Sequence, residues 1–242
     1  MPEKKPLPLV LAFDVFGTVV DWRTSIIAQT TTFLDRIGRS DLGSAALTDD
    51  WRGRYLGTMK AYASSGRGFV PLDQKHREML EEVLRERGID LDAIGDDVLT
   101  EWSHSWRRLA PWPDSVEGLA RLKRLAPIVT LSNGNVALML ELARYGGLPW
   151  DAILGAEVSR AYKPDPVSYI RTAEILGVPP AHVCLVAAHH SDLAAARKCG
   201  FATAFIARPT EYGGKRAPDA DAKQDWDWSV DSLTQLADQM GA

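Results

Sequence analysis

Polar side chains follow several apolar runs of this chain, at the points where buried strands would end. Asp14 comes directly after the run 7–13 and is followed by Gly17 and Thr18. A carboxylate behind a buried strand is costly unless something uses it. In a desolvated, oriented pocket such a carboxylate can act as a nucleophile. Three further polar clusters follow later apolar segments: Ser132-Asn133-Gly134, Tyr162-Lys163-Pro164-Asp165-Pro166 and Ala188-His189-His190-Ser191-Asp192.

Each of these side chains also has a purely structural explanation. Asp14 beside a glycine fits a turn, Lys163 fits a solvated surface charge, and Asp192 fits a helix N-cap. On its own segment, Asp14 fits either explanation equally well. Ligands of open α/β sheets, however, bind at the carboxyl ends of the strands, and the clusters fall there. This coincidence favours one shared site with two carboxylates, a lysine and the Ser132-Asn133 pair.

The elements that must hold these clusters alternate along most of the chain. Four apolar segments are typical of strands and three amphipathic segments of helices: 127–131, 152–154, 183–187 and 203–206, then 135–145, 166–176 and 192–199. This alternation predicts an α/β fold with a doubly wound, parallel, Rossmann-like sheet. Residues 22–110 carry only helix and loop patterns. The sequence therefore predicts a core domain of residues 1–21 and 111–242, with an all-helical cap domain of residues 22–110 inserted after the first strand.

Capping residues and polar stretches mark where several elements begin or end. Thr48 can cap a helix through its hydroxyl, and Asp114 begins a capping-box-like pattern. The segments 64–68 and 211–226 have loop compositions. We expect the second of these to be a surface loop, ahead of a short helix near 230–239.

Composition and charge restrict the classes of function. The chain has 242 residues, a net charge of −4 and a pI near 5.8, so it lacks the basic excess that a nucleic-acid surface needs. No apolar run approaches the roughly 18–20 residues of a membrane helix, and the segment MPEKKPLPLV has no signal-peptide pattern. The two cysteines, Cys184 and Cys199, form no CxxC pair. We therefore expect a cytoplasmic protein that contacts neither nucleic acid nor a membrane.

Taken in order, the polar motifs resemble those of the haloacid dehalogenase superfamily: Asp14-x-x-x-Thr18, Ser132-Asn133-Gly134, Lys163-Pro164-Asp165-Pro166 and the downstream Asp192. Within the superfamily, the chain is most similar to the L-2-haloacid dehalogenases of type II. The similarity covers nearly the whole chain, including the inserted helical cap. YKPDPVSY at 162–169 together with LSNG at 131–134 is a specific pair of signals, whereas FDVFGT at 13–18 alone is less specific.

Phe16 separates this family from the phosphatases of the superfamily. Those enzymes carry a second aspartate two positions after the nucleophile, where it protonates the leaving oxygen and neighbours Mg²⁺. Here that position is Phe16, and the last motif offers His189 and Asp192 without an added acidic residue. A halide leaves without a proton, so the substitution is harmless to dehalogenation. Mg²⁺ prefers several oxygen ligands and is disfavoured, and we expect no metal and no cofactor.

The resemblance implies hydrolysis of short 2-haloacids such as haloacetate and L-2-halopropionate. The nucleophile would attack the carbon that bears the halogen, and water would then hydrolyse the aspartyl ester, which frees a 2-hydroxy acid of inverted configuration. The implied site comprises the nucleophile Asp14 with Thr18, Lys163 to keep it ionised, Ser132 for the substrate carboxylate, Asn133 and Arg52 for the halide, Phe16 and Tyr169 at the substrate, and Asp192 near the hydrolytic water.

Several assignments keep an alternative. Arg52 is chosen because the family takes this arginine from a Trp-Arg pair, here Trp51-Arg52, but it also fits a solvated helix position. The family often has Asn where this chain has His189. This histidine either tightens the pocket for a small leaving group, such as fluoride from fluoroacetate, or only anchors water. Three tryptophans near the cap-to-core junction either wall the pocket or pack the core: Trp102, Trp106 and Trp112.

Two other functions remain as alternatives. One is a phosphatase acting on a small phosphomonoester, and the other is a catalytically silent binding protein on the same fold. Because relatives are often dimers, a homodimer is expected by analogy alone. The preferred halogen, the substrate chain length and the residue that activates water stay open.

Overall fold

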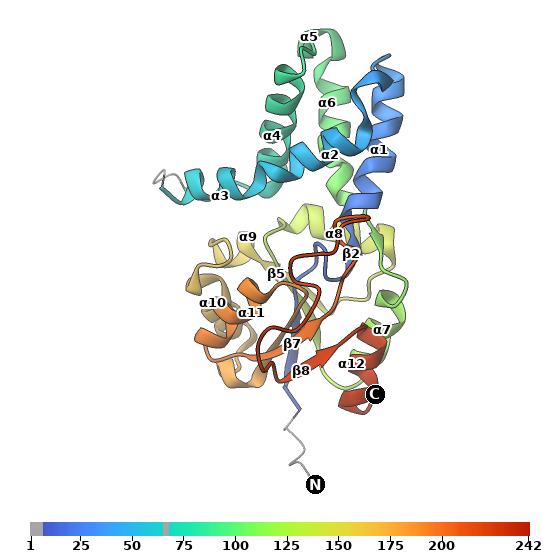
Figure 1. Ribbon diagram of the computed structural model, residues 1–242. Coiled ribbons are helices and arrows are strands. Elements are labelled where there is room, and N and C mark those ends of the chain that lie inside the picture. Colours follow the sequence, from blue (N-terminus) through green and yellow to red (C-terminus); the bar gives the residue numbers. More distant parts are fainter. Residues whose placement is uncertain (1–6, 65–67) are drawn as a thin grey trace.

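The computed structural model describes residues 7–64 and 68–242, which form a core sheet covered by helices and a group of helices beside it (Figure 1). Most of the predicted loop at 64–68 and the start of the MPEKKPLPLV segment lie outside these described residues. Within the described residues, no helix combines the length and the apolar character needed to cross a membrane.

One parallel sheet organises the core, in the strand order β5-β4-β1-β6-β7-β8. The strands are β1 (Val10–Phe13), β4 (Ile128–Ser132), β5 (Ala152–Gly155), β6 (Val183–Ala187), β7 (Ala202–Ile206) and β8 (Trp228–Val230). This sheet confirms the predicted α/β fold. Because β1 lies between β4 and β6, the connections leave it in opposite directions, and sheets of this kind bind ligands at the carboxyl end of such a strand, which is where Asp14 lies.

Helices cover both faces of the sheet. They are α7 (Ser115–Leu122), α8 (Val136–Gly146), α9 (Ala156–Ser159), α10 (Pro166–Leu176), α11 (His190–Lys198) and α12 (Leu233–Met240), with the short turn η3 (Pro180–His182). Leu11 and Phe13 of β1 pack in the apolar layer that contains residues of α7, α8 and α12. Val10 and Ala12 pack in the opposite layer with residues of α10 and α11. Burial on both faces explains why the strands are continuous apolar runs.

A short antiparallel pair joins the core to a group of helices. It consists of β2 (Val20–Asp21) and β3 (Ala110–Pro111). The helices between them are α1 (Trp22–Arg36), η1 (Ser40–Leu42), α2 (Ser44–Gly53), α3 (Tyr55–Ser64), α4 (Leu72–Glu86), α5 (Leu91–Ile94), α6 (Asp96–Ser103) and η2 (His104–Arg107). Figure 1 shows α1 to α6 above the core, on the side opposite the N-terminus. This is the helical cap insertion that the sequence predicts.

Two predicted caps are wrong. The helix expected near Thr48 begins at Ser44, so Thr48 lies inside α2 with its hydroxyl buried and unpaired. Asp114 does precede α7, but its carboxylate makes no cap to that helix. It instead pairs with Arg208 and accepts a hydrogen bond from the backbone N–H of Leu233. A distant guanidinium is a stronger partner for this carboxylate than the helix end beside it.

Candidate active site

Asp14 lies one residue beyond β1 and is anchored by its backbone N–H, which donates to the carbonyl of Val186 at 3.0 Å. Its side chain is only 10% exposed. The two carboxylate oxygens have different partners. Oδ1 accepts from Lys163 Nζ at 2.9 Å, while Oδ2 accepts from Thr18 Oγ1 at 2.7 Å and lies 3.2 Å from His189 Nδ1.

The first set of partners, here named the lysine arm, runs from Asp14 Oδ1 through Lys163 and Asp192 to Tyr169. Lys163 Nζ also donates to Asp192 Oδ2, and the Tyr169 hydroxyl donates to Asp192 Oδ1 at 2.6 Å. Lys163 precedes α10, Tyr169 belongs to α10, and Asp192 sits in the first turn of α11. The lysine arm therefore brings together residues that the sequence predicts for one site.

The second set, here named the histidine arm, runs from Asp14 Oδ2 through His189 and Glu211 to Trp22. His189 Nε2 lies 3.1 Å from Glu211 Oε2 and 3.2 Å from Oε1. The indole N–H of Trp22 donates to Glu211 Oε1 at 3.0 Å. Thr18 supports the same oxygen of Asp14, because its own oxygen is fixed by the backbone N–H of Ala188 at 2.9 Å.

Charges in these arms keep Asp14 ionised despite its burial. Burial alone would raise the pKa of Asp14, but Lys163 and His189 hold it well below its usual range. Burial alone would lower the pKa values of the two cations. Asp14 and Asp192 raise that of Lys163 above its usual value, and Asp14 and Glu211 raise that of His189 to about 10. An ionised carboxylate sheltered from water is the state in which such a group acts as a nucleophile.

Asp192 differs from Asp14 although both contact Lys163. Burial raises the pKa of Asp192, with a further contribution from the charge of Asp14. Of these two carboxylates, Asp192 is therefore the first to take up a proton on acidification, which is the property expected of a general base.

Asn133, Ser132 and Arg52 lie around this network. The Asn133 amide donates to the Tyr55 hydroxyl at 2.8 Å and accepts from the Lys163 backbone N–H at 2.8 Å. Ser132 is fully buried at the end of β4, where its hydroxyl accepts from the Gly134 N–H. The Arg52 guanidinium lies over the rings of Tyr55 and Trp22, at 4.6 and 5.4 Å from their centroids. Arg52 of α2 thus reaches the core site through aromatic side chains.

Phe16 takes part in an aromatic cluster between core and cap. Its ring meets those of His76 and Trp106 edge-on, with centroids 6.5 and 6.0 Å apart. Burial and Arg52 lower the pKa of His76, so its ring is neutral at this junction. Of the other tryptophans singled out, Trp102 stacks on Phe33 within the cap, and Trp112 donates to the Gly17 carbonyl. Trp106 is therefore the one that borders Phe16.

Three residues that contact the site are not predicted from the sequence. Tyr55 follows Arg52 by three positions, a spacing that could have suggested a shared face. Trp22 and Glu211 carry no local signal, because they meet from positions 189 residues apart. The segment 211–226 forms no regular element, as predicted, but it is not wholly a surface loop, since Glu211 is 2% exposed.

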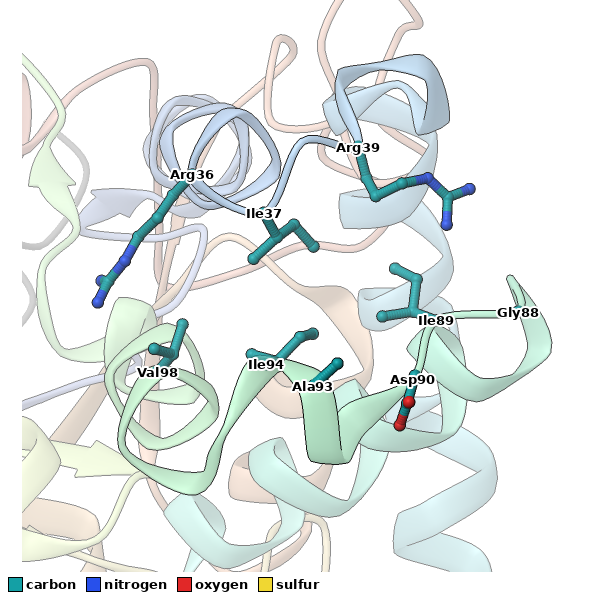
Figure 2. A pocket seen from close by; sticks show the side chains of 9 residues that line it. All are labelled: Arg36, Ile37, Arg39, Gly88, Ile89, Asp90, Ala93, Ile94 and Val98. Atoms are coloured by element: carbon teal, nitrogen blue, oxygen red, sulfur yellow. The ribbon is translucent and has the colours of Figure 1, made fainter.

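A hollow of about 380 Å³ lies elsewhere in the cap, lined by residues of α1, α5 and α6 and of the segments that follow α1 and α4 (Figure 2). Its lining combines apolar side chains such as Ile37, Ile89 and Ile94 with charged ones, and Figure 2 shows Arg36 and Arg39 at its edge. It contains none of the residues of either arm. Among the described residues, no group of three or more His, Cys, Asp or Glu side chains could hold a metal ion.

Comparison with known proteins gives three kinds of match. A family model described as haloacid dehalogenase-like hydrolase matches residues 9–200. A (S)-2-haloacid dehalogenase of Xanthobacter autotrophicus is 30% identical over 82% of this chain and 74% of that protein. A phosphoglycolate phosphatase of Neisseria meningitidis is 25% identical over 95% of this chain and 92% of that protein. The crystal structure of a defluorinating L-2-haloacid dehalogenase superposes with a TM-score of 0.95 at 45% identity, covering 100% of this chain and 98% of that one.

Proposed function

The chain belongs to the haloacid dehalogenase-like hydrolases, and on this premise we propose that it is a (S)-2-haloacid dehalogenase that hydrolyses short 2-haloacids to 2-hydroxy acids. The observation that carries the proposal is an ionised Asp14 held by Lys163 and His189, with Phe16 two positions later. The carboxylate is fit to attack carbon, and the apolar Phe16 offers no proton to an alkoxide leaving group. A halide needs no such proton.

In the first step, an oxygen of Asp14 attacks the substrate carbon that bears the halogen. The new C–O bond forms as the C–X bond breaks in line, and the halide leaves with the bonding electrons. We assign Ser132 and the N–H groups beside it to the substrate carboxylate, because this segment precedes helix α8. Arg52 and Asn133 are assigned to the departing halide, since Tyr55 links both side chains. A guanidinium lowers the energy of the charge that develops there.

In the second step, water attacks the carbonyl carbon of the ester on Asp14. The carbon–oxygen bond to the product then breaks on the Asp14 side, which returns the carboxylate and frees the 2-hydroxy acid with inverted configuration. Asp192 is assigned to the hydrolytic water, because its raised pKa suits it to accept a proton and Lys163 and Tyr169 fix its orientation.

Fluoride release is the finer part of the proposal. The defluorinating relative at 45% identity supports it. Both ring nitrogens of His189 face carboxylates, so this residue would hold Asp14 in the position that a small halide such as fluoride requires, without making the carboxylate itself more reactive. In the first turnover of His189→Asn, before hydrolysis of the shared ester limits the rate, fluoride release from fluoroacetate should fall more than chloride release from chloroacetate. Equal losses would remove His189 from halogen selectivity.

We also propose a cytoplasmic homodimer that binds no nucleic acid. Its cysteines are both free thiols, which suits a reducing compartment, and its net charge of −4 repels phosphate backbones. Helix α10 carries exposed apolar side chains at Val167, Ile170 and Ile175, a surface that a second copy could cover. Light scattering of wild type and Ile170→Glu tests the dimer, because the new charge should leave a monomer.

Halide release from chloroacetate, L-2-chloropropionate and fluoroacetate, in the presence of a chelator, tests the main proposal. Wild type should release halide, and Asp14→Asn should release none above background. Phosphate release from an aryl phosphate that depends on Mg²⁺, without halide release, would instead favour the phosphatase alternative. Turnover of neither substrate would favour a silent binding protein.

A further inference from the structure

The two oxygens of Asp14 are unequally occupied. A carboxylate oxygen accepts about two hydrogen bonds in its plane. Oδ2 already receives the Thr18 hydroxyl and faces the His189 ring nitrogen, whereas Oδ1 receives Lys163. Oδ1 therefore keeps a lone pair for attack on carbon. In the ester that follows, Oδ2 is the carbonyl oxygen.

The ester step places negative charge on that oxygen. When water bonds to the carbonyl carbon, the C=O π electrons move onto Oδ2, and they return when the bond from that carbon to Oδ1 breaks. One proton of the water goes to the departing product oxygen and the other leaves the regenerated carboxyl group. Donors that already face Oδ2 act on this charge without rearrangement, which is the arrangement of an oxyanion hole.

Glu211 determines the protonation state of His189, and with it whether the ring can donate a hydrogen bond to Oδ2 of Asp14. Both ring nitrogens of His189 lie within 3.2 Å of carboxylate oxygens, which only accept hydrogen bonds. Only the doubly protonated ring satisfies both contacts. Glu211 is 2% exposed and is itself held by Trp22 Nε1, so it is a fixed anion behind the ring.

The backbone leaves room for this buried carboxylate. A Cβ on Gly17 would lie 2.2 Å from Glu211 Oε1, and Gly17 has a φ of +81°. The turn that follows Asp14 thus accommodates Glu211 because residue 17 has no side chain. The turn of residues 14–18 thus carries the nucleophile and Thr18, and its glycine leaves room for the carboxylate that contacts His189.

We propose that Glu211 is a positioning residue that keeps His189 a cation, and that His189 with Thr18 stabilises the oxyanion formed during hydrolysis of the ester on Asp14. The inference rests on the proposed dehalogenase function. In the first step the same cation stabilises the negative charge of the Asp14 carboxylate before it attacks, so it does not accelerate alkylation. Loss of Glu211 should therefore slow the second step and spare the first.

The experiment is rapid-quench kinetics of chloroacetate turnover by Glu211→Gln, with intact-protein mass spectrometry. We expect a halide burst of about one equivalent per active site, then a steady rate lowered by about 10²-fold, with ester accumulating on Asp14. Glu211→Asp should recover part of the steady rate, because it restores the charge. Glu82→Gln, the same change at an exposed surface pair, should behave as wild type.

Other results contradict the proposal. A loss of the burst in step with the steady rate, or turnover at the wild-type rate, would overturn it. If Glu211→Gln does not fold, His189→Gln decides by the same readout, since it removes the cation and keeps a donor. Failure of wild type to release halide from any haloacid would overturn the dehalogenase function itself, and with it this inference.

Discussion

The lysine arm and the histidine arm flank Asp14 with the same order of groups. Each has a cation against Asp14, a second buried carboxylate behind the cation, and an aromatic donor on that carboxylate. They differ in whether the cation needs its second carboxylate in order to be protonated at neutral pH. A lysine is charged at neutral pH with or without help, whereas a histidine with an ordinary pKa near 6.5 is not. The second carboxylate thus has a different role in each arm: Glu211 keeps His189 protonated, whereas Asp192 is not needed to keep Lys163 charged. Each arm can therefore be tested separately.

Lys163→Met should have the largest effect, because it removes the cation that lies between Asp14 and Asp192. One of the two would then take up a proton. We expect haloacid turnover to fall by about 10²–10⁴-fold. Lys123→Met is the matched control, since Lys123 pairs with Asp151 at the surface. Turnover within about twofold of wild type in Lys163→Met would mean that the lysine arm does not maintain the nucleophile.

Tyr169→Phe should have a smaller effect on the same arm. The hydroxyl lowers the pKa of Asp192, so its removal should raise that pKa further. Turnover should fall by about tenfold near neutral pH, and the acid limb of the rate profile should move to higher pH. Tyr145→Phe, at an exposed position, is the control. An acid limb that stays in place, or moves to lower pH, would mean that protonation of Asp192 does not cause the loss of rate at acid pH.

His189 of the histidine arm should affect the free energy of unfolding as well as the rate of turnover. Because the folded protein raises the pKa of His189 from 6.5 to about 10, the stabilisation is complete below pH 6.5 and is lost as pH rises through 10. The difference in unfolding free energy between wild type and His189→Asn should therefore shrink between these values, by about 1 kcal/mol per pH unit.

Denaturant unfolding of both proteins at pH 7, 8, 9 and 10 measures this difference. His182→Asn, the same substitution at an exposed histidine, is measured beside them as the control. A gap between wild type and His189→Asn that is constant or widens would mean that His189 is neutral in the folded protein.

The smallest effect is expected in the cap hollow of Figure 2. Arg36 at its edge pairs with Glu101 in solvent, and neither belongs to an arm. Arg36→Ala should leave kcat and KM for chloroacetate within about twofold of wild type, as surface changes usually do. A large change in either constant would show that the hollow communicates with the two arms.

The difference between the arms also explains what the sequence could reveal. Lys163, Tyr169 and Asp192 lie in segments that follow strands, so the α/β alternation and the family motifs together find the lysine arm. The sheet is predictable for the same reason, because continuous apolar runs alternate with amphipathic ones. Strand β8 (Trp228–Val230) is missed because it has three residues and a partly exposed pattern.

The histidine arm beyond His189 is not predictable in this way. Glu211 lies in a polar segment whose composition indicates a solvated loop, and Trp22 opens a helix of the cap. Their contact arises from chain folding that closes a separation of 189 residues. Similarly, Asp114 leaves its local helix for Arg208, a partner that no local pattern indicates.

Single-turnover hydrolysis of chloroacetate in ¹⁸O-labelled water, with enzyme in excess, tests the covalent role of Asp14 most directly. If Asp14 forms an ester and water attacks its carbonyl carbon, the label must appear in the Asp14 carboxylate while the glycolate stays unlabelled. Label in the glycolate, with an unlabelled Asp14 peptide, would contradict the account.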